Sequence, residues 1–251
     1  MSKIAVVTGA TSGIGRATAV ALAKQGYRII ATGRRKERLE ELQQELEDTT
    51  TVLPLLFDVR NKEAVQFAFA SLPEEWQQID VLINNAGNAH GLSPIQDGAL
   101  EDWDAMLDIN VKGLLYVSHA IIPFMQEQGK GHIINVGSVA GKEVYANGNV
   151  YCASKHAVDA LSKAMRIDLI QTGIKVSEVN PGAVETEFSE VRFKGDKERA
   201  AAVYQGYQPL TADDIADLIA FIVTRPPHVN LAEVLILPAA QASATVMNKN
   251  L

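Results

Sequence analysis

The chain has 251 residues, of which 47% are hydrophobic and 21% are charged, and its formal net charge is −7. This composition is typical of a globular protein and excludes a disordered or collagen-like chain. The acidic balance argues against a nucleic-acid partner, and the single cysteine, Cys152, excludes an internal disulfide and a cysteine-based zinc site. The histidines show no metal-ligand spacing, and no apolar run is as long as a membrane span. The sequence therefore predicts a cytoplasmic protein with no metal and no membrane contact.

Short apolar runs alternate with amphipathic segments along the chain. The segments predict helices at residues 16–25, 36–47, 101–128 and 150–171. Several of the apolar runs lack polar alternation, as do strands that are covered on both faces. The predicted strands are residues 4–8, 28–32, 52–57, 81–83, 132–136, 175–179 and 234–237.

This order predicts an α/β protein with a single-domain Rossmann fold over residues 1–251. We expect a doubly wound parallel sheet of about seven strands with helices on both faces, because parallel crossovers are right-handed. The long polar segment at residues 185–210 interrupts the alternation. Such insertions often form lids, so a substrate lid is expected there.

A glycine-rich turn directly follows the first predicted strand. Its glycines would allow the backbone to approach a pyrophosphate, and the next helix would present free N–H groups and the positive end of its dipole. A tight turn without a ligand would look the same locally, but the strand–turn–helix context favours a dinucleotide. The residues expected to bind it are Gly9, Thr11, Ser12, Gly13, Ile14 and Gly15.

Two arginines, Arg34 and Arg35, follow the second predicted strand. Folds that bind NAD usually place an acidic residue near this point to hold the ribose 2′-hydroxyl, but the first acid here is Glu37. Guanidinium groups suit the 2′-phosphate of NADP instead. With Lys36, the arginines would place three cations in the first turn of a helix, where the dipole disfavours them and a bound anion would stabilise them. A solvated charged face is the alternative, but we expect NADP as the cofactor.

The spacing Gly-x-x-x-Gly-x-Gly and the stretch Asn84-Asn85-Ala86-Gly87 resemble the short-chain dehydrogenase/reductase family. The resemblance implies that Asp58 and Val59 contact the adenine, although Asp58 could equally be the N-cap of a helix. It implies further cofactor contacts from Asn85, Ala86, Gly87, Pro181, Gly182, Val184 and Thr186.

Tyr151 and Lys155 are four residues apart in a predicted helix, so their side chains share one face. A free tyrosine has a pKa of about 10, which a neighbouring ammonium lowers. We expect Tyr151 to be the general acid/base for the substrate oxygen and Lys155 also to bind the cofactor. Ser138 would hydrogen-bond the same oxygen, although capping of a strand end is its alternative role. The resemblance adds Asn110 as a fourth catalytic residue, and a structural place within a helix is its alternative.

Within the family, residues 31–39, 148–151 and 186–196 are similar to those of bacterial NADP-dependent 3-hydroxy acid (serine) dehydrogenases. This implies hydride transfer between NADP and C3 of a small hydroxy acid, such as serine or 3-hydroxyisobutyrate, or the reverse reduction of an oxo acid or semialdehyde. Arg192 and Lys194 lie in the predicted lid, and either could bind the substrate carboxylate unless it is a solvated surface charge. We expect Arg192 to bind it, beside Ser138 and Tyr151. A general carbonyl or 3-oxoacyl reductase and an NADP-sensing regulator are the alternatives. The resemblance also implies a homotetramer.

Overall fold

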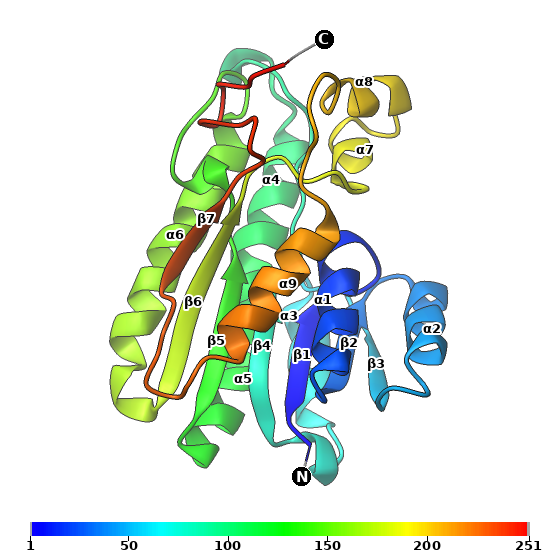
Figure 1. The fold of residues 1–251 in the computed structure, drawn as a ribbon, viewed down its shortest axis with the longest axis vertical. Helices are drawn as coiled ribbons and strands as arrows, with labels where there is room; N and C mark the ends of the chain where they lie inside the picture. Colours follow the sequence, from blue (N-terminus) through cyan, green and yellow to red (C-terminus); the bar gives the residue numbers. More distant parts are fainter. Residues whose placement is uncertain (1, 250–251) are drawn as a thin grey trace.

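The strands pair in parallel in one sheet in the computed structural model, which describes residues 2–249 (Figure 1). Their order is β3-β2-β1-β4-β5-β6-β7. Because β1 lies between β2 and β4, successive strands are added on opposite sides of it, and ligands bind beside the carboxyl ends at such a switch point. The strands are β1 Ile4–Thr8, β2 Arg28–Gly33, β3 Val52–Leu56, β4 Ile79–Asn84, β5 Gly131–Val136, β6 Ile174–Pro181 and β7 Glu233–Ile236.

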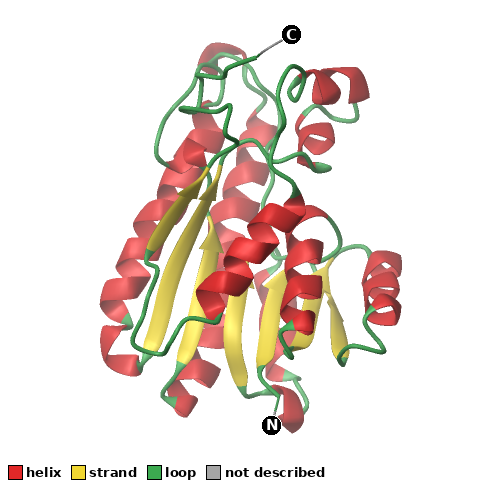
Figure 2. Ribbon diagram, viewed as in Figure 1, coloured by secondary structure: helices red, strands yellow, loops and turns green. Residues whose placement is uncertain are grey.

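Helices cover both faces of this sheet, as Figure 2 shows. On one face α1, α2 and α9 pack on alternate strand residues, and on the other α3, α5 and α6 pack on the remaining ones. Two short helices, α7 and α8, lie beyond the carboxyl ends of the strands. The helices are α1 Gly13–Lys24, α2 Lys36–Glu45, α3 Lys62–Ala70, α4 Leu100–Leu107, α5 Leu114–Gln128, α6 Asn149–Asp168, α7 Phe188–Arg192, α8 Lys197–Ala202 and α9 Ala212–Val223.

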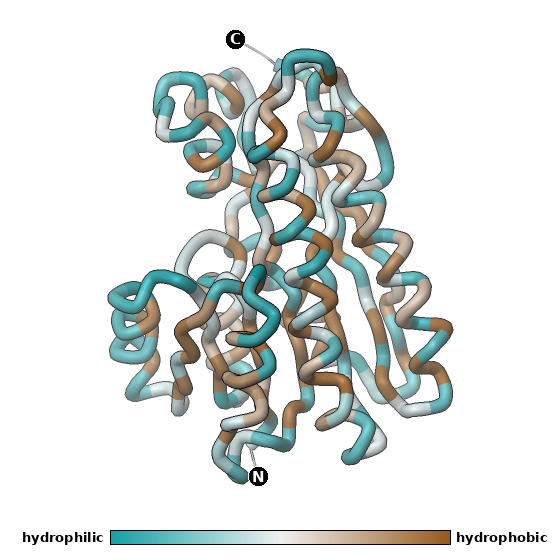
Figure 3. The backbone as a smooth tube through the Cα atoms, turned by 180° about the vertical axis from the view of Figure 1, so that it is seen from behind, coloured by the Kyte–Doolittle hydropathy of each residue, from teal (hydrophilic) through white to brown (hydrophobic). Residues whose placement is uncertain are grey.

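Alternating strand side chains divide the core into two apolar layers. In β1, Val6 faces the layer with α3, α5 and α6, whereas Val7 faces the layer with α1, α2 and α9. Both side chains are fully buried, and burial of a valine contributes about 1.5–3 kcal/mol. The hydropathy colouring in Figure 3 shows this pattern: hydrophobic stretches follow the strands, whereas α2 is largely hydrophilic outside its buried leucines.

The predicted doubly wound parallel sheet is confirmed, and each predicted strand overlaps an observed one. One helix start was wrong. Helix α1 begins at Gly13 rather than at residue 16, so Gly13 and Gly15 belong to its first turn. Helix α2 begins at Lys36 as predicted, but Arg34 and Arg35 precede it. The expectation that three cations crowd its first turn is therefore wrong.

The predicted helix at 101–128 is a continuous helical run in which a π-helical turn, Asp108–Gly113, separates α4 from α5. By length and composition alone, the run Leu100–Gln128 is apolar enough to cross a membrane. Its buried members, such as Val117, Ile121 and Met125, belong to the core beside the sheet. Packing in the core therefore accounts for its apolar side chains.

Candidate active site

A cleft of about 560 Å³ opens at the carboxyl ends of the strands. Its walls come from the β1–α1 turn, the ends of β2 to β6 and the segment after β6. Of the predicted site residues, only Gly15 and Asn110 lie behind this surface. Those that line it are Gly9, Thr11, Ser12, Gly13, Ile14, Arg34, Arg35, Asp58, Val59, Asn85, Ala86, Gly87, Ser138, Tyr151, Lys155, Pro181, Gly182, Val184, Thr186 and Arg192.

The β1–α1 turn packs tightly against the end of β4. A Cβ atom on Gly15 would lie 2.3 Å from the carbonyl oxygen of Gly9 and 2.4 Å from Nδ2 of Asn85, so no side chain fits there. Asn85 donates a 2.8 Å hydrogen bond from Nδ2 to the carbonyl oxygen of Thr8, which ties the ends of β1 and β4 together. The turn therefore leaves the N-terminus of α1 at the cleft, where its free N–H groups suit a phosphate.

The donors expected for a 2′-phosphate gather beside this turn. Arg35 donates from Nη2 to Oγ1 of Thr11 at 2.9 Å and to Oγ of Ser12 at 2.7 Å. Arg34 lies 3.6 Å from a carboxylate oxygen of Asp58. Two guanidinium groups and two hydroxyls at the mouth of the cleft fit a ribose phosphate, and the glycine turn beside them fits a pyrophosphate. The residues present thus fit a phosphorylated dinucleotide.

Asp58 is not a helix cap. Asn61 caps α3, because its side chain accepts a 2.9 Å hydrogen bond from the backbone N–H of Ala64. The Asp58 carboxylate instead accepts from Arg60, at 2.6 Å from Nη2. Although partial burial raises it, hydrogen bonds from Arg60 leave the pKa of Asp58 below its usual value. Asp58 is therefore a charged group on the wall of the cleft.

Tyr151 and Lys155 lie on the buried side of α6, next to Ser138 at the end of β5. Lys155 donates from Nζ to the carbonyl oxygen of Val136 at 2.9 Å, and burial lowers its pKa to about 8. Burial raises the pKa of Tyr151, although a hydrogen bond with Ser138 and the cation of Arg192 oppose the increase. The pKa of Tyr151 is therefore raised rather than lowered as expected, because desolvation outweighs the nearby hydrogen bond and cation.

Ser138 has the capping role that was expected as its alternative, and it also lines the cleft. Its Oγ accepts a 3.1 Å hydrogen bond from the backbone N–H of Ala140 and so caps a short 3₁₀ turn. Its backbone N–H donates to Oδ1 of Asn180 at 3.0 Å. A serine held at its own amide and at its hydroxyl has a fixed position at the cleft surface.

Asn110 occupies the π-helical turn between α4 and α5 and is buried. Its Oδ1 accepts from the backbone N–H of Asn88 at 2.8 Å, and its Nδ2 donates to the carbonyl oxygen of Asn88 at 2.8 Å. Nδ2 also donates to Oγ of Ser154 on α6 at 3.0 Å. Asn110 thus fixes the loop after β4 against the helix that holds Tyr151, and π-helical turns often occur at such functional positions.

Arg192, at the end of α7, extends over the acid/base candidate. Its guanidinium carbon lies 5.2 Å from the centre of the Tyr151 ring, and its Nη2 donates to the hydroxyl of Tyr145. Its buried Nε has no hydrogen-bond partner among the described residues. The backbone N–H of Gly91 donates to the carbonyl oxygen of Arg192 at 3.0 Å, which fixes the end of α7 to the loop after β4. A buried, unpartnered cationic donor in a cleft suits an anionic ligand.

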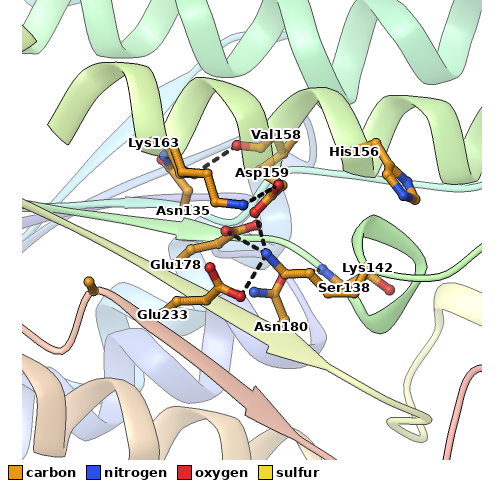
Figure 4. A network of polar contacts seen from close by, with 12 residues as sticks. Asn135, Ser138, Lys142, His156, Val158, Asp159, Lys163, Glu178, Asn180 and Glu233 are labelled. Atoms are coloured by element: carbon orange, nitrogen blue, oxygen red, sulfur yellow. Dashed lines mark hydrogen bonds and ion pairs between the residues drawn. The ribbon is translucent and has the colours of Figure 1, made fainter. Parts of the chain in front are cut away.

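The sequence missed several residues that support the site. Asn88, Tyr145 and Asn180 hold Asn110, Arg192 and Ser138 respectively, and Figure 4 shows Asn180 beside Ser138. Asn88 could have been found from the sequence, because it is an asparagine in the loop after a predicted strand, as Asn85 is. Tyr145 gave no signal, because its role depends on where the distant α7 lies.

Behind Ser138, Lys142 lies among three carboxylates, as Figure 4 shows. Asp159, Glu178 and Glu233 place ligand-type oxygens within 4.8 Å of one another. Nζ of Lys142 is 3.4 Å from Glu178 and 2.9 Å from Glu233, and it also contacts Asp159. The ammonium group of Lys142 supplies the positive charge that this acidic cluster needs.

Comparison with known proteins identifies this arrangement. Residues 3–197 match the family model described as short chain dehydrogenase. The chain belongs to the short-chain dehydrogenase family. The chain is therefore an oxidoreductase of this family, and the cleft with Ser138, Tyr151 and Lys155 is its candidate active site.

Curated relatives are similar over nearly the whole chain. The NADP-dependent 3-hydroxy acid dehydrogenase of Salmonella typhi is 47% identical over 96% of this chain and 97% of its own length. Sulfoacetaldehyde reductase 2 of Chromohalobacter salexigens is 45% identical over 96% of each chain. Among solved structures, the closed form of serine dehydrogenase complexed with NADP+ is 45% identical, with a TM-score of 0.92 over 97% of this chain and 98% of that one.

Proposed function

We propose that this protein is an NADP-dependent oxidoreductase that transfers a hydride between NADP and C3 of small 3-hydroxy acids, such as serine or 3-hydroxyisobutyrate. In reverse it would reduce 3-oxo acids or semialdehydes. The observation that supports the acid specificity is the buried Nε of Arg192, which has no hydrogen-bond partner within residues 2–249. The guanidinium carbon of Arg192 lies 5.2 Å from the centre of the Tyr151 ring. The similarity to 3-hydroxy acid and serine dehydrogenases supports both the substrate class and the cofactor.

NADP, when bound, supplies the hydride donor or acceptor at C4 of its nicotinamide. The chain's own residues then manage the substrate oxygen and its proton. Ser138 donates a hydrogen bond to that oxygen and stabilises the charge that develops on it. Tyr151 gives its proton to the oxygen during reduction and removes it during oxidation. Lys155, whose pKa is about 8 in the ligand-free chain, is largely charged at neutral pH and favours the phenolate when Tyr151 loses its proton.

A broader carbonyl reductase is the second candidate, and it too is compatible with the lid. The relative named sulfoacetaldehyde reductase would act on a sulfonate, an anion that a guanidinium binds as it binds a carboxylate. A regulator that only senses NADP has less support, because it would not need the gathered Ser138, Tyr151 and Lys155. Small anionic substrates are therefore favoured over neutral ones.

Arg192→Ala tests the substrate class. We expect it to raise KM for serine, 3-hydroxyisobutyrate and 3-hydroxypropionate by about ten- to hundredfold, since a hydrogen bond to a charged group is worth about 1.5–3 kcal/mol. KM for a neutral carbonyl compound should change little. Lys194→Ala is the matched control, because Lys194 is an exposed lid cation that pairs with Asp102 at 3.0 Å. Equal losses for acids and neutral carbonyl compounds would contradict the assignment of carboxylates as substrates.

The double variant Arg34→Ala/Arg35→Ala tests the cofactor. We expect its KM for NADPH to rise by about ten- to hundredfold while its KM for NADH stays within about twofold, since only NADPH brings a phosphate to these donors. Lys36→Ala is the control, because Lys36 is a neighbouring cation whose partner is Glu40 on the same helix. Steady-state kinetics with both cofactors measure the outcome, and an unchanged NADPH/NADH ratio would contradict the phosphate assignment.

The proposal also includes a single domain with a lid at residues 185–210, a homotetramer and a cytoplasmic location. Both α7 and α8 lie in the lid segment. Exposed apolar side chains on α6 and β7, including Ile167 at 73% and Leu235 at 47% exposed, support burial of these elements between subunits.

A further inference from the structure

Glu187 directly precedes α7 and reaches back to the donors that are expected for the cofactor phosphate. Its Oε2 accepts from Nη1 of Arg35 at 2.9 Å, and its Oε1 lies 3.4 Å from Nη1 of Arg38. Hydrogen bonding by Arg35, the charge of Arg38 and a hydrogen bond from Ser12 keep the pKa of Glu187 below its usual value, so the side chain is an anion at neutral pH. A carboxylate of the chain itself thus pairs with an arginine that is expected to bind the cofactor phosphate.

The other N–H groups of Arg35 donate to hydroxyl groups of the glycine-rich turn. Its Nε and Nη2 donate to Oγ1 of Thr11, and Nη2 also donates to Oγ of Ser12. Arg35, Thr11, Ser12 and Glu187 all line the cleft. One guanidinium with two hydroxyls is a set that binds planar or tetrahedral oxyanions. Glu187 therefore has the position and the charge of a phosphate substitute.

A 2′-phosphate carries more negative charge than a carboxylate, and two anions repel at close range. When the phosphate approaches Arg35, the phosphate gains the stronger ion pair. Arg38, which already contacts the second oxygen of Glu187, can keep this carboxylate paired. The exchange of partners then leaves no charge without a counter-ion.

We propose that Glu187 is an internal competitor for the 2′-phosphate site and that NADP binding transfers Arg35 from Glu187 to the phosphate. This deepens the function proposed above and rests on its assignment of NADP. NAD, which lacks the phosphate, would leave the Glu187–Arg35 pair in place. Glu187 thereby sets how strongly the site prefers the phosphorylated cofactor.

The exchange also reaches the substrate side of the cleft. Thr186 lies against the glycine turn, since a Cβ on Gly13 would be 3.3 Å from its side chain. Glu187 begins the segment that continues through α7 to Arg192 above Tyr151. Glu187, near the start of the lid, therefore responds to the phosphate, and Arg192, the last residue of α7, lies over the ring of the acid/base.

The test is a calorimetric titration of Glu187→Gln with adenosine 2′,5′-bisphosphate and with 5′-AMP, which lacks the 2′-phosphate. Glutamine keeps the size of the side chain and removes its charge. Exposed ion pairs are worth about 0.2–1 kcal/mol, so the bisphosphate should bind to the variant about 1.4- to fivefold more tightly than to the unmodified chain. Binding of 5′-AMP should be unchanged. Glu190→Gln is the matched control, because it removes the same charge from an exposed position in α7.

An equal gain for both nucleotides, or the same gain in Glu190→Gln, would show a general charge effect and overturn the proposal. Weaker binding of the bisphosphate would mean that Glu187 holds the lid over the ligand, which also overturns it. In an Arg35→Ala background, Glu187→Gln should have no effect, because the competition passes through Arg35. Titration of the unmodified chain tests the NADP assignment separately. If that chain does not bind the bisphosphate more tightly than 5′-AMP, the NADP assignment itself is wrong, whatever Glu187→Gln does.

Discussion

Tyr151→Phe is expected to lower kcat by about 10²- to 10⁴-fold, the range for loss of a general acid/base. The phenol is buried on α6 next to Ser138, and phenylalanine keeps its ring and its packing against Phe188, 5.7 Å away between ring centres. The substitution therefore removes a proton donor without opening a cavity. Steady-state kinetics measure the loss, and titration with NADP should show a Kd within about twofold of the unmodified chain.

The control for this prediction is Tyr116→Phe. Tyr116 is a partly buried tyrosine on α5 that packs against the core away from the cleft. The Tyr116→Phe variant should keep its activity, because Tyr116 does not line the cleft and loss of its hydroxyl changes neither the proton transfer nor the cofactor site. If Tyr151→Phe kept a tenth or more of kcat, another group would have to exchange the proton, and the assigned mechanism would be wrong.

Most of the fold could be predicted from the sequence, because both faces of a parallel sheet are buried and its strands are continuous apolar runs. A boundary error of three residues in total occurs at β4, where the observed strand Ile79–Asn84 is longer than the predicted residues 81–83. Asp80 interrupts the apolar run, but its carboxylate accepts from the backbone N–H of Ile4 and pairs with Lys130. A polar residue with two partners is compatible with a strand, and the pattern alone does not show those partners.

The site residues could be predicted where they lie within a local motif, as in the glycine turn and the Tyr151–Lys155 pair. The electrostatics could not, because they depend on burial. The Tyr151 pKa is raised, since the desolvation of its phenol outweighs the nearby cations. The role of Glu187 depends on a contact with Arg35 across 152 residues of chain, and no local spacing indicates such a contact.

The cluster around Lys142 places buried charged groups directly behind the candidate active site. Glu178 is fully buried, and one of its oxygens has no hydrogen-bond partner among the described residues. A Cβ on Gly137 would lie 2.5 Å from that oxygen and 2.1 Å from Oδ1 of Asn180, so Glu178 and Asn180 both press against the backbone that leads to Ser138. Burial raises the pKa of Glu178, and Lys142 opposes the increase. Lys142 thus favours the charged form of a buried carboxyl group beside the loop that holds Ser138.

Lys142→Met should lower the free energy of unfolding at pH 7 by about 3 kcal/mol, the lower end of the range for a buried pair that loses one partner. The lower end applies because the Lys142 side chain retains 19% exposure. Methionine keeps most of the volume and removes the cation from three neighbouring carboxylates. Lys163→Met is the control: Lys163 also pairs with Asp159, at 2.8 Å, but its side chain is 51% exposed. Its loss should cost less than about 1 kcal/mol. Urea denaturation of both variants measures the difference.

The pH dependence separates a charge effect from a packing defect in Lys142→Met. Without Lys142 the pKa of Glu178 rises further, so the folded variant binds a proton more readily than the unfolded chain does, and its stability recovers as pH falls from 7 towards about 5. Asp159 does not oppose this recovery in that window. Although partial burial raises it, hydrogen bonds from Lys142 and Lys163 hold the pKa of Asp159 at about 2 in the unmodified chain. Its stabilising contribution is therefore lost only as pH falls below the unfolded value of about 4. The stability gap between the variant and the unmodified chain should thus narrow between pH 7 and pH 5, whereas a gap that stays constant would mean that Lys142 acts by packing alone.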